Sequence, residues 1–329
     1  MEIRSDFFGK SLLTLMEYTP DEIAYFIDWA IELKRLKRAG IHNYYLKDKN
    51  IAMVFEKTST RTRCATSIAC LDEGGHADFL GKDAIQLGKK ESIKDTARVL
   101  GRMYDGILYR GYEQKSVEML AEHSGVPVIN GLTDDFHPTQ VLADLMTAKE
   151  CFGKIRGLKM AYIGDGRNNM ANSLMLGCVR MEMDFAIGAP KNLFPAEKII
   201  KKAEEMKGSR SVLLTEDPYE AVKGADIIYT DVWVSMGEPV EVWKERINEL
   251  SPYQVNKQVM SYADKNAVFM HCLPAFHDLK TTVGKEMGEK FSRTEMEVTD
   301  EVFESEQSIV FDEAENRMHT IKAVMAATL

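Results

Sequence analysis

The stretch IAMVFEKTSTRTR, residues 51–63, joins a short apolar run to a cluster of hydroxyl and cationic side chains. The run 51–55 has the length and composition of a buried strand. The nine residues from Phe55 to Arg63 hold four hydroxyls and three cations. A strand that ends where a helix begins would direct backbone N–H groups and the positive helix end at one point, which suits a phosphate. A polar first helical turn with solvated arginines is the alternative explanation.

Apolar runs alternate with amphipathic segments along the rest of the chain, and this order favours parallel sheets. A length of 329 residues exceeds one ordinary core and suggests two domains. We therefore predict an α/β fold of two domains, each with a mainly parallel sheet flanked by helices and joined by interdomain helices. Strands are expected at 51–55, 106–109, 127–129, 159–163, 184–187, 211–214, 227–230 and 267–270, and helices at 19–40, 59–71, 91–104, 137–153, 173–179, 197–206 and 314–329.

Composition excludes several classes of partner. The net charge of −9 disfavours general binding to nucleic acid or to a membrane surface. Five widely spaced cysteines, without a C-x-x-C pair, indicate neither a disulfide framework nor a zinc site. No run approaches 18 apolar residues, and the mixed charges of the N-terminus are not typical of a signal peptide. We expect a cytoplasmic protein with no metal and no cofactor.

Four polar clusters follow predicted strands, where parallel sheets bind ligands. They are TSTRTR (58–63), GDGRNN (164–169), DVWVSMGEP (231–239) and HCLPAFHD (271–278). The second begins like a dinucleotide-binding loop but has Asn169 in place of the third glycine, which disfavours a nicotinamide cofactor. Its amide could instead bind a carboxylate or ammonium group of a small substrate.

Single residues in these clusters and in HPTQ (137–140) allow two interpretations each. His137 could donate to a carbonyl oxygen, with Gln140 accepting from an amide, or could merely cap a helix. Asp231 suits a cationic amine or a turn cap. Cys272 is either a buried structural thiol or a polar contact to a reacting amine. A cysteine protease is disfavoured because His271 would point to the opposite face of the strand.

Taken together, FEKTSTRTR, HPTQ, DVWVSMGEP and HCLPAFHD closely resemble the aspartate/ornithine carbamoyltransferase family, and the resemblance covers essentially the whole chain. It implies a carbamoyl phosphate domain at 1–150 and an ornithine domain at 151–314, with a helix at about 315–329 packing back onto the first. It also implies a homo-oligomer, a trimer or a multiple of trimers, whose active sites lie between subunits.

The activity implied by the resemblance is transfer of the carbamoyl group from carbamoyl phosphate to the δ-amine of L-ornithine, giving L-citrulline and phosphate. The SMG signature at 235–237 favours ornithine over aspartate or putrescine as the acceptor. Synthesis and breakdown of arginine use the same residues, so the sequence leaves the direction open. A nicotinamide dehydrogenase, a non-catalytic anion-binding protein and a transferase for another amine remain the alternatives.

The resemblance also assigns site residues. The catalytic set is Arg110, His137, Cys272 and Asp231. The carbamoyl phosphate set is Ser59, Thr60, Arg61, Thr62, Arg63, Gln86, Arg110, His137, Gln140, Cys272, Leu273 and Arg317. The ornithine set is Asn169, Asp231, Ser235 and Met236, with Asn168 left open.

Their expected roles follow the charges of the reaction. Arg61 is the main phosphate ligand, part of the role of Arg63 is an internal ion pair, and Gln86 acts in a neighbouring subunit. Arg110 and His137 would stabilise the oxyanion that forms when the δ-amine attacks the carbamoyl carbon. The departing phosphate can take the amine's proton, so no protein base is required.

Overall fold

The structure is a computed structural model that describes residues 5–85, 87–88, 90–234 and 240–329. It divides into two compact units. Unit 1 consists of Met1–Glu150 and Ala314–Leu329, and unit 2 is Cys151–Glu313. The chain leaves unit 1 near the end of α5 (Pro138–Phe152) and re-enters it within α13 (Val310–Thr328).

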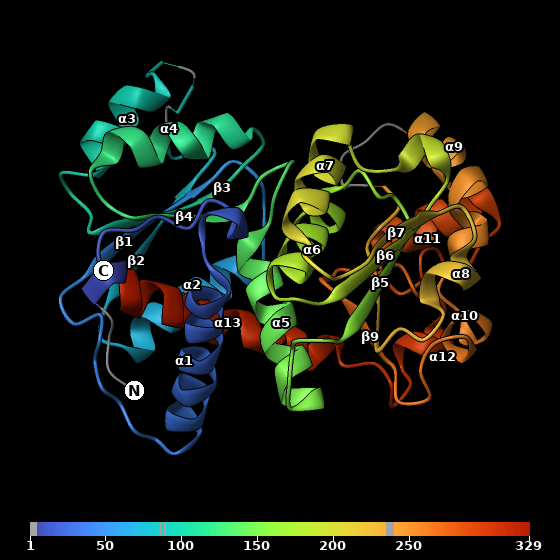
Figure 1. Cartoon of the computed structure of the whole chain (residues 1–329). Helices are drawn as coiled ribbons and strands as arrows, with labels where there is room; N and C mark the ends of the chain where they lie inside the picture. The colour runs from blue at the N-terminus through green and yellow to red at the C-terminus, as the bar shows by residue number, and fades with distance from the viewer. Residues whose placement is uncertain (1–4, 86, 89, 235–239) are drawn as a thin grey trace. The chain divides into compact units, whose positions relative to one another are not determined.

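Unit 1 is built on a four-stranded sheet in the order β2-β1-β3-β4, with every neighbouring pair parallel. Helices α1, α2 and α13 lie on one side of this sheet and α3 and α4 on the other (Figure 1). The strands are β1 (Asn50–Phe55), β2 (His76–Gly81), β3 (Gly106–Arg110) and β4 (Val128–Leu132), and the remaining helices are α1 (Pro20–Arg38), α2 (Arg61–Asp72), α3 (Ile93–Leu100) and α4 (Gln114–Ser124).

Unit 2 is built on a five-stranded parallel sheet in the order β7-β6-β5-β8-β9. Its strands are β5 (Lys159–Ile163), β6 (Asp184–Gly188), β7 (Val212–Thr215), β8 (Ile227–Thr230) and β9 (Val268–His271). Its helices are α6 (Asn169–Arg180), α7 (Glu197–Met206), α8 (Pro218–Val222), α9 (Val240–Leu250), α10 (Lys257–Ser261), α11 (Thr282–Phe291) and α12 (Asp300–Phe303).

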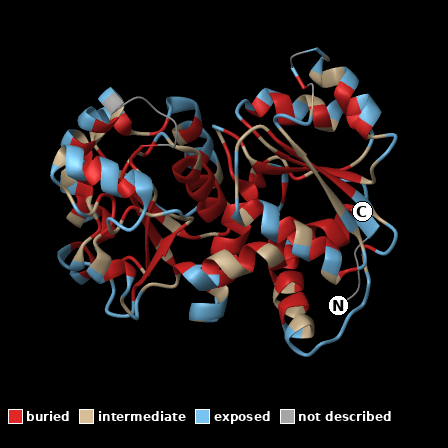
Figure 2. Cartoon of the chain, turned by 180° about the vertical axis from the view of Figure 1, so that it is seen from behind, coloured by how far each residue is buried: buried red, intermediate tan, exposed pale blue. Residues whose placement is uncertain are grey.

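The central strands of both sheets are buried, as Figure 2 shows in red. Burial on both faces explains why β1, β3, β5 and β8 are almost continuously apolar rather than alternating. Among the described helices, none is long and apolar enough to cross a membrane.

Local signals explain the best predicted helix. Thr19 caps α1 by accepting from the Glu22 N–H at 3.3 Å, and the Glu22 side chain accepts from the Thr19 N–H at 2.8 Å. This capping box and Pro20 in the first turn fix where the helix begins.

The predicted α/β class is confirmed, and the predicted strands match observed ones to within a few residues. Several elements were missed, namely β2, α4, α8, α9, α10, α11 and α12. Strand β2 is only half-buried and reads HADFLG, so it lacks the apolar run of a central strand. Helix α2 begins at Arg61 rather than at 59, and α13 begins at Val310 rather than at 314.

Candidate active site

Three of the predicted residues of unit 1 meet at one hydroxyl group. Strands β1 and β3 pair in parallel with Phe55 opposite Arg110, which brings the loop after β1 beside the end of β3. Arg110 Nη1 donates to Thr62 Oγ1 at 3.4 Å, and Arg317 Nη2 from α13 donates to the same oxygen at 2.7 Å. Thr62 is fully buried and Arg317 is 2% exposed. Two guanidinium groups are therefore held together at the start of α2.

The start of α2 has no negative charge of its own to offset the charges of these two guanidinium groups. Its first turn contains no acidic residue, and it has arginines at 61 and 63 instead. Ser59 Oγ accepts from the Thr62 N–H at 3.2 Å, whereas Thr60 makes no capping bond with its side chain. The positive helix end and the guanidinium groups both favour an anion.

His137 lies in the field of the same arginines. Burial lowers the pKa of its imidazole well below the usual value, and the charges of Arg317, Arg110 and Arg61 lower it further. The ring is 3% exposed, and its Nδ1 lies 3.3 Å from Thr139 Oγ1. The imidazole is therefore neutral at pH 7, and a neutral imidazole can still donate one hydrogen bond.

This shift predicts how stability depends on pH. The unfolded chain binds a proton at His137 near pH 6.5, whereas the folded chain does so only at a lower pH. Stability from this group is therefore complete above pH 6.5 and is lost as the pH falls toward the folded pKa. We expect the free energy of unfolding of wild type, minus that of His137→Gln, to fall by up to about 1.4 kcal/mol per pH unit in that window. Denaturant titrations of both proteins between pH 7 and 5 measure this difference in the free energy of unfolding. A difference that does not change with pH would contradict the lowered pKa of His137.

Gln140 and Arg63 are placed differently from each other. Gln140 lies in the first turn of α5, is 1% exposed, and donates from Nε2 to Asp144 Oδ1 at 2.9 Å. Arg63 is exposed, and its guanidinium lies 4.0 Å from the centroid of the Phe79 ring. The structure thus stacks Arg63 on an aromatic ring, where an internal ion pair was expected.

The predicted residues of unit 2 gather where three neighbouring strands end. Strands β5, β8 and β9 are adjacent and parallel, so the loops that follow them meet at one sheet edge. Cys272 Sγ donates to Asp231 Oδ1 at 3.2 Å, and Asn168 Nδ2 donates to Asp231 Oδ2 at 3.2 Å. The Val232 N–H adds a bond of 2.8 Å to Oδ1. Asp231 is therefore the shared acceptor of this cluster.

Asn168, which sequence reasoning left open, is the amide that contacts Asp231. Its Oδ1 caps α6 by accepting from the Ala171 N–H at 2.9 Å, and its Nδ2 also donates to the Tyr162 hydroxyl at 2.8 Å. Asn169 is the first residue of α6, and its carbonyl accepts from the Ser173 hydroxyl. The preference of Asn for the position just before a helix was the available signal.

Burial raises the pKa of the Asp231 carboxyl above its usual value. The charge of His271 and the bonds from Cys272 and Val232 act in the opposite direction. A cationic group placed beside this carboxyl would favour its charged form further, because opposite charges stabilise each other most in a buried position.

A buried network that the sequence did not predict holds the Cys272–Leu273 turn. His271 Nδ1 accepts from the Leu273 N–H at 2.8 Å, and its Nε2 lies 3.3 Å from Glu297 Oε1. Glu313 accepts from the His271 N–H at 2.9 Å and from the Tyr229 hydroxyl at 3.0 Å. Both carboxylates are fully buried. Burial opposes the charged form of His271, but the bond and charge of Glu297, with Asp231 and Glu313, raise the pKa of its imidazole.

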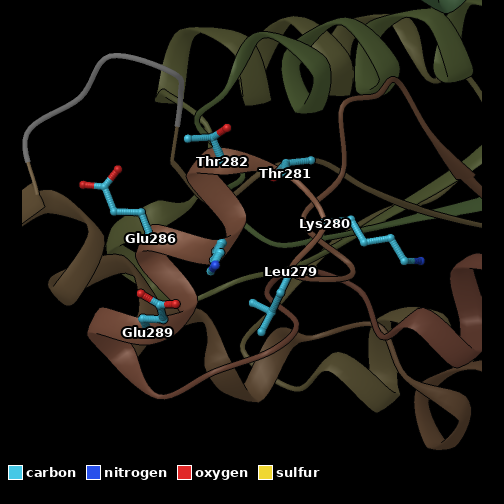
Figure 3. Close-up of a pocket in the computed structure, with 7 residues that line it drawn as sticks. Leu279, Lys280, Thr281, Thr282, Glu286 and Glu289 are labelled. Carbon is cyan, nitrogen blue, oxygen red and sulfur yellow. The ribbon is translucent and has the colours of Figure 1, made fainter.

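Three predicted residues, Gln86, Ser235 and Met236, lie outside the described residues. Within the described ranges, two groups have the side chains to hold a metal ion: Asp231 with His271 and Cys272, and His277 with Asp300 and Glu304. A surface pocket of about 390 Å³ borders α11 and is lined by Leu279, Lys280, Thr281, Thr282, Lys285, Glu286 and Glu289 (Figure 3). None of these lining residues is a predicted site residue.

Comparison with known proteins gives matches over nearly the whole chain. The carbamoyl-P binding domain of aspartate/ornithine carbamoyltransferase matches residues 10–150, and the Asp/Orn binding domain of that family matches residues 156–328. A catabolic ornithine carbamoyltransferase of Treponema denticola is 60% identical over 98% of this chain and 96% of its own length. One from Bacillus thuringiensis is 57% identical over the same shares. The ornithine carbamoyltransferase structure from Pyrococcus furiosus has a TM-score of 0.90 and 44% identity, covering 98% of this chain and 97% of that one.

Proposed function

Since this chain belongs to the aspartate/ornithine carbamoyltransferase family, we propose that it transfers the carbamoyl group between carbamoyl phosphate and the δ-amine of L-ornithine. The observation that carries the proposal is the meeting of Arg110 and Arg317 at Thr62, beside Arg61 at the start of α2. The buried, neutral imidazole of His137 lies in the field of all three arginines. Such a site suits a doubly charged phosphate joined to a polarised carbonyl.

Unit 1 is the proposed carbamoyl phosphate domain. Arg61 and the backbone at the start of α2 bind the phosphate, together with Ser59, Thr60 and Thr62. Arg110 and His137 donate to the carbonyl oxygen, and Gln140 binds the carbamoyl amide. Arg317 fixes the position of Thr62 through the 2.7 Å bond and adds positive charge. Arg63, stacked on Phe79, contributes to the field rather than by direct contact.

Unit 2 is the proposed ornithine domain. The half-buried Asp231 carboxylate binds the substrate's α-ammonium, assisted by Asn168, and Asn169, Ser235 and Met236 complete the amino-acid site. Cys272 and the backbone of Leu273 face the reacting δ-amine and the carbamoyl group. The carboxylates of Glu297 and Glu313 hold that turn in position through their contacts with His271.

The reaction proceeds through a tetrahedral intermediate. The lone pair of the neutral δ-amine forms a bond to the carbamoyl carbon, and the carbonyl oxygen gains negative charge. Arg110 and His137 stabilise that charge. The intermediate collapses by breaking the bond between carbon and the phosphate oxygen, and phosphate leaves with the proton of the amine. Run in reverse, the same steps break citrulline down with phosphate.

The substrates define a direct assay. We expect the purified chain, given carbamoyl phosphate and L-ornithine, to release phosphate and form citrulline in equal amounts. Citrulline and phosphate together should regenerate ornithine slowly. Phosphate release without citrulline would indicate hydrolysis only and would contradict the proposal.

We also propose a cytoplasmic homotrimer or a multiple of it. The cysteines at 64, 70, 151, 178 and 272 are all free thiols, which fits a reducing compartment. Unit 1 exposes the large apolar side chains of Leu71 (69%) and Met103 (70%), and these are candidates for burial in the assembly.

Light scattering after gel filtration tests the assembly. We expect a mass of three times the chain mass, or a multiple of that value. Leu71→Glu and Met103→Glu together should shift the mass toward the single chain if these side chains lie in the interface, because a buried unpaired carboxylate is costly. Tyr262→Glu, which changes an apolar side chain of unit 2 that is 50% exposed, serves as the control. A single-chain mass for wild type would contradict the assembly.

A further inference from the structure

A cluster in unit 2 has the composition of a metal site, and the proposed reaction makes no use of it. It consists of His277, Asp300 and Glu304, whose ligand atoms all lie within 4.8 Å of one another. His277 follows β9 in the HCLPAFHD segment, whereas Asp300 begins α12 and Glu304 follows its last turn. Segments far apart in sequence therefore place one imidazole and two carboxylates together.

The three side chains come from positions that the fold fixes. The His277 ring stacks on the buried Phe303 ring at a centroid distance of 3.7 Å and an interplanar angle of 11°. Its Nδ1 lies 2.7 Å from Asp300 Oδ1. The Asp300 N–H donates to Glu295 Oε1 at 2.8 Å, and the Glu304 N–H donates to the Asp300 carbonyl at 2.9 Å. Asp300 and Glu304 therefore lie one helical turn apart, with the imidazole beside them.

The local field favours a cation at this position. Lys280 bonds to Asp278 Oδ2 at 2.8 Å, and the pKa of its ammonium is raised first by that bond and charge, and further by the charges of Asp300 and Glu304. In Figure 3 the Lys280 side chain extends away from Glu286 and Glu289 of α11. The two carboxylates of the cluster thus already attract one positive charge, which a bound metal ion would have to compete with.

We propose that His277, Asp300 and Glu304 form a binding site for a divalent transition metal ion of the Zn²⁺, Co²⁺ or Ni²⁺ type. One imidazole nitrogen with two carboxylate oxygens suits these ions, whereas Ca²⁺ and Mg²⁺ bind mainly oxygen ligands. Metal–ligand bonds of about 2.1 Å place neighbouring ligand atoms about 3.4 Å apart in a tetrahedron. The Glu304 side chain is exposed, so its carboxylate is free to move to that distance from the other two ligand atoms.

The bound ion would connect the HCLPAFHD segment to α12. His277 lies four residues after Leu273, so the ion would brace the segment that also carries Cys272. Binding displaces the proton between His277 and Asp300, since a metal-bound imidazole nitrogen must be deprotonated. The remaining coordination positions are filled by water.

Calorimetric titration of the full chain with Zn²⁺, after dialysis against a chelator, tests the site. Cys272→Ser is the background, because Asp231, His271 and Cys272 form a second group able to hold a metal ion. We expect one Zn²⁺ per chain in that background. Asp300→Asn and Glu304→Gln should each weaken binding by more than about tenfold, since even loss of an outer partner of a ligand typically costs about 10- to 100-fold.

Two further variants separate a metal site from a simple ion pair. Glu301→Gln, on the same short helix but paired with Lys257 at 2.7 Å, should leave the affinity unchanged. Lys280→Met should strengthen Zn²⁺ binding, because it removes the competing cation. Absence of saturable binding in the Cys272→Ser background would overturn the proposal, as would equal affinity in the Glu304→Gln and Glu301→Gln variants. Neither outcome bears on carbamoyl transfer, which is measured separately.

Discussion

Replacing Arg61 with alanine should lower kcat/KM for carbamoyl phosphate by about 100- to 1000-fold while the fold remains intact, since this is the usual cost of removing one group that stabilises developing charge. Arg61 begins α2, and its charge is one of three that depress the pKa of His137. Its side chain and the positive helix end act on the same anion. Steady-state kinetics and calorimetry with carbamoyl phosphate measure the loss.

Arg63→Ala is the matched control for that experiment. It removes the same charge two residues further along α2, from an exposed side chain stacked on Phe79. We expect a much smaller effect, because long-range attraction through water is screened by salt. Full carbamoyl phosphate affinity in Arg61→Ala, or an equal loss in Arg63→Ala, would contradict the assigned role of Arg61.

The second large effect is expected for Asp231→Asn, which keeps the shape of the side chain and removes its charge. The kcat/KM for ornithine should fall by an amount equivalent to about 2–5 kcal/mol, the usual cost of removing one partner of a buried charge pair. Carbamoyl phosphate affinity should change much less, because the proposed ligands of its phosphate and carbonyl oxygen, Arg61, Arg110 and His137, lie in unit 1. Kinetics with ornithine as the varied substrate measure the first effect. Calorimetry with carbamoyl phosphate measures whether the affinity for that substrate changes.

The pH profile gives this variant a second readout. Burial raises the pKa of Asp231, so in wild type the KM for ornithine should rise as the pH falls toward that pKa and the carboxylate gains a proton. Asp231→Asn should lack this acidic limb. Asp165→Asn, which alters a carboxylate bonded to Arg167 in the loop after β5, is the control and should keep it. An unchanged ornithine KM in Asp231→Asn would remove Asp231 from the site.

The alternation of apolar strands and helices was enough to predict the α/β class, and four clusters at strand ends gave the residues of the proposed site. Both signals are local, because a parallel sheet places the ends of its strands at one edge. Among the strands, the one that the sequence concealed is β2, whose side chains are half-buried and mixed in character. Edge strands of this kind have little periodicity to detect.

The contacts between distant segments could not be predicted. Thr62 is joined to Arg317 across 255 positions of sequence, and Glu313 reaches the Tyr229 hydroxyl and the His271 backbone. Such partners depend on how helices close over a sheet, which no single-sequence pattern encodes. The stacking of Arg63 on Phe79 has the same origin, since Phe79 belongs to the strand that was missed.

The most direct test of the central claim compares amines as carbamoyl acceptors. Purified wild type is given carbamoyl phosphate with L-ornithine, putrescine, L-aspartate or N-acetylornithine, and the carbamoylated product of each is quantified. We expect the highest kcat/KM for ornithine, because it offers both a free α-ammonium for Asp231 and a δ-amine. N-acetylornithine has no free α-ammonium, and aspartate has no δ-amine. A higher kcat/KM for any of the other three amines, or no carbamoylated product from ornithine, would contradict it.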